Sequence, residues 1–429
     1  MVPIMSITVF VLAVVLMILG SPVFVAIGLS SILTIVFYHP VPLISIPQLM
    51  FSGMESYVLV AIPLFILAGV MMETCGVAKH LINFCKAQVS WARGGLGAVN
   101  ILSSFIFGGI SGSSVADTVA IGSIMIPEME EDGYSKEYSA AITVISSTLS
   151  VVVPPSILMI ILGGVAELSV SWLLVGGIVP GILMTLSMMI QNNIISRRHS
   201  FGHVKKFSFS YLWKTFKCGF WALGAPAIIL SGIMTGIVTP TESGAIVFFY
   251  TLIISIFYYK TMNWKVLYRS FINGAQITAS VVSIIAVSSI FTFILTFEGL
   301  PQIAAKALLS ISTKPIVILM LINILLLFVG MLIDAGVAII ILAPILFPVV
   351  LQVGVDPIHF GVLVVLNLAI GLVTPPFGVC LFSVCNVAKI SMENLLKASF
   401  PLYASLLVVL ILATLFPNIV LFLPKLIFG

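Results

Sequence analysis

Paired prolines stand twice in the middle of long apolar runs of this chain, as Pro154-Pro155 and as Pro375-Pro376. Proline lacks a backbone donor and pushes the residue before it out of helical geometry, so neither run can form one unbroken helix. Inside a bilayer, backbone without helical hydrogen bonds is tolerated only where it is buried in protein or lines a cavity. The two pairs therefore predict two broken helices in a membrane-embedded fold.

The proline pairs belong to a longer internal repeat. The second pair begins 221 residues after the first (375 minus 154), and the same shift places Gly109 on Gly330 and Pro127 on Pro348. Broken helices at matching positions of two halves are typical of transporters whose ion and substrate sites lie between the halves. The repeat therefore indicates a transporter.

The composition excludes a soluble protein. Of 429 residues, 61% are hydrophobic and 7% are charged, and the mean hydropathy is +1.28. At roughly 20 apolar residues per crossing, the chain has room for about ten crossings, so we predict an all-α integral membrane protein. The five cysteines show no metal-ligand spacing and imply no disulfide framework.

Charge and spacing divide the predicted fold into two inverted repeats. We expect a first repeat over 1–195, a basic linker over 196–217 and a second repeat over 218–429. Basic residues gather in the linker and in loops near 79–93 and 260–269, which the positive-inside rule places in the cytoplasm. Both termini are then predicted to be periplasmic.

The number of crossings agrees with this orientation only if two segments are re-entrant. The segments 95–127 and 315–350 are interrupted by Gly, Ser, Asp or Pro, and each is long enough for two half-length helices that meet at a tip. The broken helices are expected near 138–163 and 358–388. One hairpin enters from each side of the membrane in this arrangement, which is the inverted repeat found in many transporters.

The linker permits two interpretations. It carries six basic residues and no acid, as a nucleic-acid-binding arm would. Because it is short and lies between membrane helices, we interpret it as a cytoplasmic connection that fixes the topology and contacts anionic lipid headgroups. No nucleic-acid partner is expected.

The first predicted tip is rich in small polar residues, from Gly108 to Asp117. Backbone carbonyls and hydroxyls can replace part of the water shell of a monovalent cation such as sodium. The alternative is that Gly108 and Gly112 only allow close helix packing. A broken helix at 153–156 that can face this tip favours the ion site.

The second predicted tip carries an acid, Asp334, which falls opposite Ser113 under the 221-residue shift. An ionisable residue inside the membrane is costly unless it meets an ion, a substrate or polar backbone. A carboxylate that caps the following half-helix is the alternative, and both roles are compatible.

Glu242 in Thr239-Pro240-Thr241-Glu242 is interpreted as a helix cap. Glu73 and Glu298 end apolar helices in the two halves and are expected in domain contacts.

Together these motifs resemble the large membrane subunit of tripartite ATP-independent periplasmic (TRAP) transporters, over nearly the whole chain. The motifs that carry the resemblance are Phe107 to Asp117, Val153-Pro154-Pro155-Ser156, Gly236 to Glu242 and Thr374-Pro375-Pro376-Phe377-Gly378. The resemblance implies sodium-driven uptake of an organic acid across the bacterial inner membrane by an elevator motion. It also implies a periplasmic substrate-binding protein (P subunit) and a separate small membrane subunit (Q subunit).

The resemblance also implies site residues, at the tip and the break of each half. Substrate-binding residues are expected to be Ser113, Asp334, Ser156 and Gly378. A first sodium site is expected at Gly109, Ser111, Gly112, Ser114, Val153 and Pro154. A second is expected at Gly330, Asp334, Thr374 and Pro375. No cofactor is expected besides sodium as the coupling ion, and sialic acid is favoured as substrate over C4-dicarboxylates.

Two rival classes share some of these features. A stand-alone sodium/carboxylate carrier would also contain hairpins and broken helices, and would need no binding protein. An intramembrane enzyme is disfavoured, because the chain has no His-Glu-x-x-His or Gly-x-Ser-x-Gly motif. No Arg lies within an apolar run, so helix dipoles, hydroxyls and sodium are expected to bind the substrate carboxylate.

Overall fold

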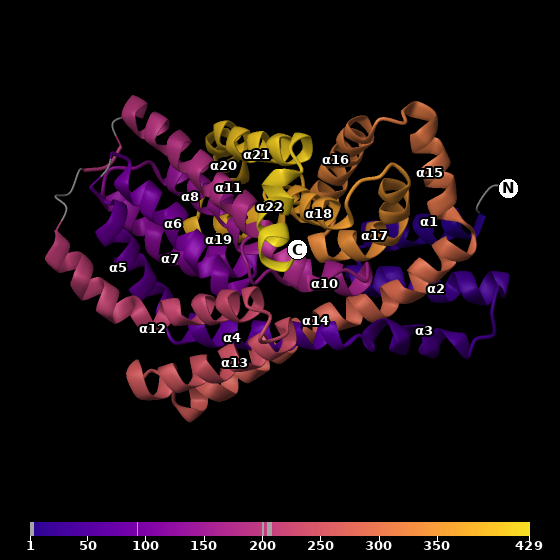
Figure 1. Cartoon of the computed structure of the whole chain (residues 1–429), viewed down its shortest axis with the longest axis horizontal. Coiled ribbons are helices and arrows are strands. Elements are labelled where there is room, and N and C mark those ends of the chain that lie inside the picture. The colour runs from indigo at the N-terminus through magenta and orange to yellow at the C-terminus, as the bar shows by residue number, and fades with distance from the viewer. Residues whose placement is uncertain (1–3, 92, 200, 204–207) are drawn as a thin grey trace.

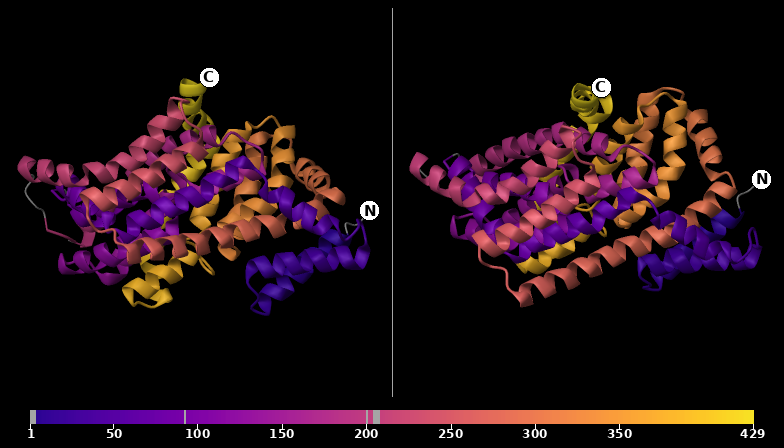
Figure 2. Two further views of the ribbon diagram at one scale, coloured as in Figure 1. Left: turned by 90° about the horizontal axis from the view of Figure 1, so that it is seen from below. Right: turned by 60° about the horizontal axis from the view of Figure 1, so that its bottom comes forward.

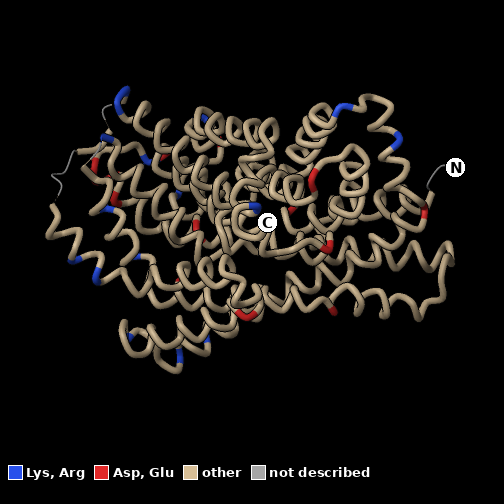
Figure 3. The backbone as a smooth tube through the Cα atoms, in the orientation of Figure 1, with Lys and Arg blue, Asp and Glu red and all other residues tan. Residues whose placement is uncertain are grey.

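The structure is a computed structural model, and it describes residues 4–91, 93–199, 201–203 and 208–429. These residues form helices joined by turns and short connections, without a strand (Figure 1). The all-α prediction is therefore confirmed. Lys and Arg lie mainly near the periphery, and most of the molecule is free of charge (Figure 3).

The first half of the chain opens with three helices and continues with the first repeat. The opening helices are α1 (Ile4–Ile18), α2 (Val23–Tyr38) and α3 (Ser45–Met54). The repeat consists of a 3₁₀ turn (Tyr57–Val60), α4 (Ala61–Thr74), α5 (Val77–Val89), α6 (Gly95–Ser111), α7 (Ser114–Glu131), α8 (Lys136–Ser146), α9 (Leu149–Val152), α10 (Ile157–Val165) and α11 (Val170–His199).

The second half has the same order of elements after two further helices. It begins with α12 (Phe209–Met234), α13 (Pro240–Ile253) and a π-helical turn (Ile254–Tyr258). It continues with α14 (Trp264–Phe297), α15 (Leu300–Ile311), α16 (Pro315–Leu332), α17 (Ala335–Gln352), α18 (Pro357–Gly371), α19 (Val379–Ala388), α20 (Met392–Ser399), a 3₁₀ turn (Phe400–Leu402), α21 (Tyr403–Leu415) and α22 (Asn418–Phe428).

The shared order makes the internal repeat visible in the fold. In each half an apolar helix, α4 or α14, is followed by a short helix of 13 or 12 residues, a helical hairpin and a broken helix. A left-handed glycine makes the turn into the short helix in both halves, with φ of +70° at Gly76 and +68° at Gly299. The long α14 extends along one side of the molecule and packs against α2, α3 and α4 (Figure 2).

The broken helices lie where the proline pairs predict them. Residues 153–156 interrupt the first one, and the helices on either side of this break are bent by 42°. In the second, α18 ends at Gly371 and α19 begins at Val379. Between them the backbone leaves helical geometry, because two consecutive prolines cannot donate to the preceding turn.

Eight helices in the described residues are long and apolar enough to cross a membrane, or nine if the bent pair α8–α10 counts as one. The chain is therefore a multi-pass membrane protein, as predicted.

The expectation of half-length hairpin helices is wrong. The two hairpins are built from helices of 17 to 18 residues, each about 27 Å long. Pro127, Pro344 and Pro348 lie inside these helices without ending them, because neighbouring helices can satisfy the freed carbonyls.

The basic linker is shorter than its predicted range of 196–217. Helix α11 continues to His199 and α12 begins at Phe209. Both helices therefore continue past their apolar runs into the predicted linker. Two of its six basic residues, Lys205 and Lys206, lie outside the described residues.

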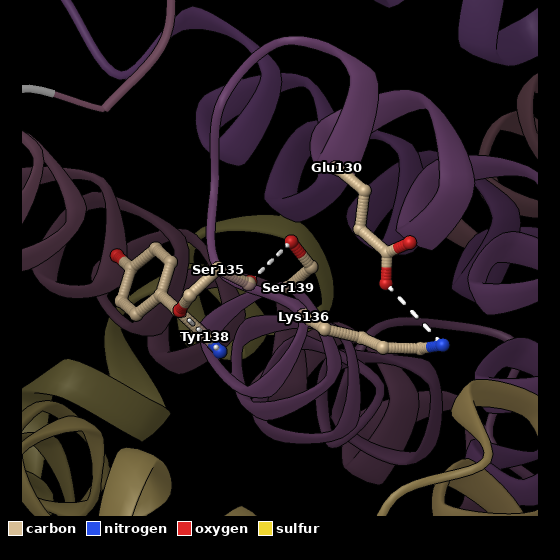
Figure 4. A network of polar contacts seen from close by, with 5 residues as sticks. All are labelled: Glu130, Ser135, Lys136, Tyr138 and Ser139. Atoms are coloured by element: carbon tan, nitrogen blue, oxygen red, sulfur yellow. Dashed lines mark hydrogen bonds and ion pairs between the residues drawn. The ribbon is translucent and has the colours of Figure 1, made fainter.

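The base of the first hairpin is fixed by polar contacts. Lys136 at the start of α8 lies 3.7 Å from Glu130 near the end of α7 (Figure 4). The Ser135 hydroxyl accepts a hydrogen bond from the backbone N–H of Tyr138 and so caps α8. Lys86 of α5 forms an ion pair with Glu128 of α7. Glu128 and Glu130 therefore join the hairpin to its neighbours.

Candidate functional site

The first hairpin tip lies directly against the first helix break. Gly112, the turn residue between α6 and α7, has a φ of +61°. A Cβ atom there would lie 2.7 Å from the carbonyl oxygen of Pro155, and one at Gly109 would lie 3.4 Å from the carbonyl oxygen of Pro154. Only glycine allows the approach at position 112, so the break presents its carbonyls to the tip.

The second tip and the second break are joined in the same way. A Cβ atom at Gly371 would lie 2.7 Å from the carbonyl oxygen of Gly330, so α18 and α16 are in backbone contact. The backbone N–H of Phe377 donates to the carbonyl of Met331 at 3.1 Å. Each tip therefore meets the break of its own half, as expected from the sequence.

The two tips place equivalent side chains at equivalent helix starts. The hydroxyl of Ser113 caps α7 and accepts from the backbone N–H of Ala116 at 3.4 Å. The carboxylate of Asp334 caps α17 and accepts from the N–H of Gly336 at 2.9 Å. The capping interpretation of Asp334 is thus confirmed.

One cavity joins both tips. Its volume is about 160 Å³, and both Ser113 and Asp334 line it. The lining also includes apolar side chains from outside the hairpins, namely Ile66 from α4 and Ile277, Val281 and Ile284 from α14. The α14 residues were not singled out from the sequence, because isoleucine and valine on an apolar helix give no signal of a site.

Three helices begin at the cavity. The first residues of α7, α10 and α17 are Ser114, Ile157 and Ala335, and all three line it. Helix N-termini present unpaired backbone N–H groups and the positive end of the helix dipole, which favours anions. No Lys or Arg of the described chain is among the lining residues. The cavity can therefore attract an anionic group without a basic side chain.

The predicted ligands of the first sodium site lie close together. The Ser111 hydroxyl accepts from the N–H of Ser113 at 3.4 Å, and the Ser114 hydroxyl donates to the carbonyl of Ser147 at 2.8 Å. Both serines are buried. Their oxygens and the carbonyls of the break form a neutral oxygen-rich environment, which suits a monovalent cation. Sodium binding by these residues stays a prediction.

Two predicted substrate residues lie outside the cavity wall. Ser156 is fully buried, caps α10 through the N–H of Met159 at 3.2 Å and donates to the carbonyl of Val151. Gly378 is buried against the carbonyls of the second break, where a Cβ would lie 2.8 Å from the Thr374 oxygen. Thr374 donates to the carbonyl of Ile370 at 2.5 Å. Their substrate and ion roles stay predictions.

Two of the other acids, Glu242 and Glu298, have structural contacts. Glu242 and Thr239 form a capping box at the start of α13, as predicted. Glu298, which follows α14, accepts from the backbone N–H groups of Met5 at 2.9 Å and Ser6 at 2.5 Å. It therefore caps the N-terminal end of α1 from another helix.

Comparisons with known proteins agree with this architecture. The family model described as "Tripartite ATP-independent periplasmic transporter, DctM component" matches residues 10–419. The isethionate TRAP transporter permease protein DctMQ of Oleidesulfovibrio alaskensis is 39% identical over 95% of this chain, which spans 64% of that longer protein. The C4-dicarboxylate TRAP transporter large permease protein DctM of Vibrio cholerae is 36% identical over 98% of this chain and 97% of its own length.

Two further similarities complete the comparison. The sialic acid TRAP transporter large permease protein SiaM of Vibrio cholerae is 36% identical over 89% of this chain and 90% of its own length. The crystal structure of the Alcanivorax borkumensis YdaH transporter superposes with a TM-score of 0.60 over 82% of this chain and 85% of its own, at 16% identity, and so shares the fold. Because the family model and relatives of full length cover nearly the whole sequence, this chain belongs to the DctM component of the tripartite ATP-independent periplasmic transporters, which are membrane permeases and not enzymes.

Proposed function

We propose that this chain is the large permease subunit of a transporter that couples uptake of an organic acid to the inward sodium gradient. The observation that carries the proposal is the shared cavity, which Ser113 of one repeat and Asp334 of the other line together. A site between two repeats can be opened to one side of the membrane at a time when one domain moves relative to the other.

Sodium is proposed to bind at each tip, between hairpin and break. The first site uses Gly109, Ser111, Gly112, Ser114, Val153 and Pro154, and the second uses Gly330, Asp334, Thr374 and Pro375. Backbone contact between each tip and its break supports this placement. A bound cation would also offset the negative charge of Asp334 and add positive potential for an anionic substrate.

The substrate is proposed to be an organic acid whose carboxylate faces the three helix N-termini at the cavity. Ser113 and Asp334 are the proposed contacts from the tips, with Ser156 and Gly378 acting from the breaks. Sialic acid is the first candidate and a C4-dicarboxylate the second. Relatives named for these two substrates are both 36% identical to this chain, and the isethionate relative is 39% identical. All three substrate classes are anions.

The transport motion is proposed to be an elevator movement of the hairpin-bearing domain in the bacterial inner membrane. The hairpins are proposed to be re-entrant from opposite sides, with both termini in the periplasm. The repeated element order and the basic residues between the halves support this arrangement.

A periplasmic binding protein and a small membrane subunit are the proposed partners. The family to which the chain belongs is tripartite by name, and the isethionate relative named DctMQ is longer than this chain. Anionic lipid headgroups are proposed to contact the basic residues near the linker.

Reconstituted proteoliposomes test the proposal. The chain is incorporated with its small subunit and supplied with its binding protein and radiolabelled sialic acid, a C4-dicarboxylate or isethionate. Uptake is expected only with an inward sodium gradient and the binding protein. Equal uptake with sodium replaced by potassium or choline would contradict sodium coupling. Uptake without the binding protein would favour a stand-alone carrier.

A further inference from the structure

Asp117 of α7 is a buried carboxylate that the cavity does not use. Its side chain is 0% exposed, and neither carboxylate oxygen has a hydrogen-bond partner among the described residues. It lies four positions after Ser113, about one helical turn or 6 Å further along α7. A carboxylate without partners is costly to bury as an anion, so Asp117 needs either a positive charge beside it or a bound proton.

Two serines from other helices face this carboxylate. Ser104 of α6 and Ser150 of α9 lie beside it without forming a hydrogen bond of normal geometry, and both side chains are 0% exposed. The Ser150 hydroxyl also has no hydrogen-bond partner among the described residues. Glycine at position 108 keeps this space compact, because a Cβ there would lie 2.9 Å from the Ser150 oxygen. Three helices therefore contribute oxygen atoms to one enclosed point.

The hydrogen bonds of Ser146, which contacts Ser104, affect what the space between Asp117, Ser104 and Ser150 can bind. The Ser146 hydroxyl lies 3.0 Å from the Ser104 hydroxyl, and it can donate to Asn100 Oδ1 at 3.3 Å or to the Thr143 carbonyl at 3.1 Å. Either hydroxyl can be the donor in the contact between Ser104 and Ser146, and Ser104 is the donor whenever Ser146 gives its own proton to Asn100 or Thr143. In that arrangement the oxygen of Ser104 presents only lone pairs to the carboxylate of Asp117, so acceptors face acceptors.

We propose that Asp117, Ser104 and Ser150 form an additional sodium site, one helical turn from the cavity and separate from the two tip sites. A cation held by several oxygens resolves the facing acceptors and neutralises the buried charge. The site joins α7 of the hairpin to α6 and to α9, which leads into the first break. Its occupancy therefore stabilises the contact between tip and break on which the cavity depends.

The inference rests on the proposed sodium coupling, and equilibrium binding of ²²Na⁺ to the purified complex with its small subunit tests both separately. Asp117→Asn is expected to bind one sodium ion fewer than the wild-type protein. Asp334→Asn is expected to lose a different one, so the double variant loses two. An absence of saturable ²²Na⁺ binding in the wild-type protein would overturn the proposed function, whereas an unchanged count in Asp117→Asn would overturn only this site.

A second pair of variants keeps the charge and guards against misfolding. Ser150→Ala removes one proposed ligand and is expected to raise the sodium concentration for half-saturation about fivefold, the effect of losing about 1 kcal/mol. Ser103→Ala is the matched control, because its hydroxyl is equally buried and unpartnered in the described structure but faces Cys85 of α5. Equal affinities in the two variants would contradict the site. If Asp117→Asn binds one proton fewer than the wild-type protein while its sodium count is unchanged, the Asp117 carboxyl is protonated in the wild-type protein. That outcome would also overturn the proposed site.

Discussion

Ser113 and Asp334 occupy the same position in the two repeats, 221 residues apart (334 minus 113). Each is the N-cap of the second helix of its hairpin, and both line one cavity. The repeat thus brings two equivalent backbone positions together, and these positions carry side chains of different charge. One tip contributes a neutral hydroxyl and the other a carboxylate, so any charge effect at the cavity should be asymmetric.

The first prediction separates the charge of Asp334 from its capping role. Asp334→Asn keeps a good N-cap, since Asn and Asp cap helices about equally well, so thermal stability should hardly change. Uptake should fall at least about tenfold, because an interaction with a charged group contributes about 1.5–3 kcal/mol. Asp356→Asn is the matched control. Asp356 caps α18 through the N–H of Ile358 at 2.9 Å and does not line the cavity. Equal uptake losses in the two variants would leave Asp334 with a structural role alone.

A second prediction concerns sodium affinity at the first tip. Ser111→Ala removes a buried hydroxyl next to the turn, and the sodium concentration for half-maximal uptake should rise about fivefold, which corresponds to about 1 kcal/mol. Ser123→Ala removes a hydroxyl further along α7, where it donates to the carbonyl of Ala120 at 3.1 Å. This control should keep the wild-type sodium dependence. The hypothesis fails if both variants show the same curve as the wild-type protein.

A third prediction tests the contact between the first tip and its break. Gly112→Ala places a Cβ at positive φ, which costs about 1–2 kcal/mol, and it also meets the Pro155 oxygen at 2.7 Å. Gly76→Ala carries a similar conformational cost at a φ of +70° but meets no atom within 4 Å. Thermal unfolding of the purified complex should therefore show the larger loss for Gly112→Ala, together with weaker ²²Na⁺ binding. Similar losses in the two variants would mean that the close approach is unimportant.

The ion pair at the hairpin base leads to a fourth prediction. Lys86 and Glu128 join α5 to α7, with side-chain exposures of 19% and 36%. Partly exposed pairs contribute at most about 1 kcal/mol, so Lys86→Glu or Glu128→Lys alone should lower the melting temperature by only a few degrees. The double charge reversal should restore it, because the opposite charges face each other again. A double variant less stable than either single variant would show that no direct pairing exists.

Features with a local physical cause could be predicted from the sequence. The Pro154-Pro155 and Pro375-Pro376 breaks follow from the geometry of proline alone, and Ser113 and Asp334 follow from the 221-residue shift. The capping box of Glu242 is likewise a short-range pattern. These features require no knowledge of which helices pack together.

Features that depend on tertiary packing could not be predicted. The proline residues inside α17 indicated half-length helices, yet α17 continues through Pro344 and Pro348 over 18 residues. Asp117 was visible as the end of the first tip motif, but its burial beside Ser104 and Ser150 depends on how α6 and α9 pack. The apolar wall from α14 depends on the same kind of contact.

The last prediction tests the membrane arrangement on which the proposed mechanism depends. In a chain whose native cysteines have been removed, Ser113→Cys and Asp334→Cys should react with a small aqueous thiol reagent, because both positions line the cavity. Sodium should change the rate of reaction, since a ligand shifts the balance between two states only through its different affinity for them.

Arg198→Cys and Lys265→Cys lie at exposed helix ends and serve as topology markers. In intact cells they should react only with membrane-permeant reagents if these ends are cytoplasmic. Labelling of position 198 by an impermeant reagent would reverse the proposed orientation, and inert cysteines at both tips under every condition would exclude an aqueous cavity between the repeats.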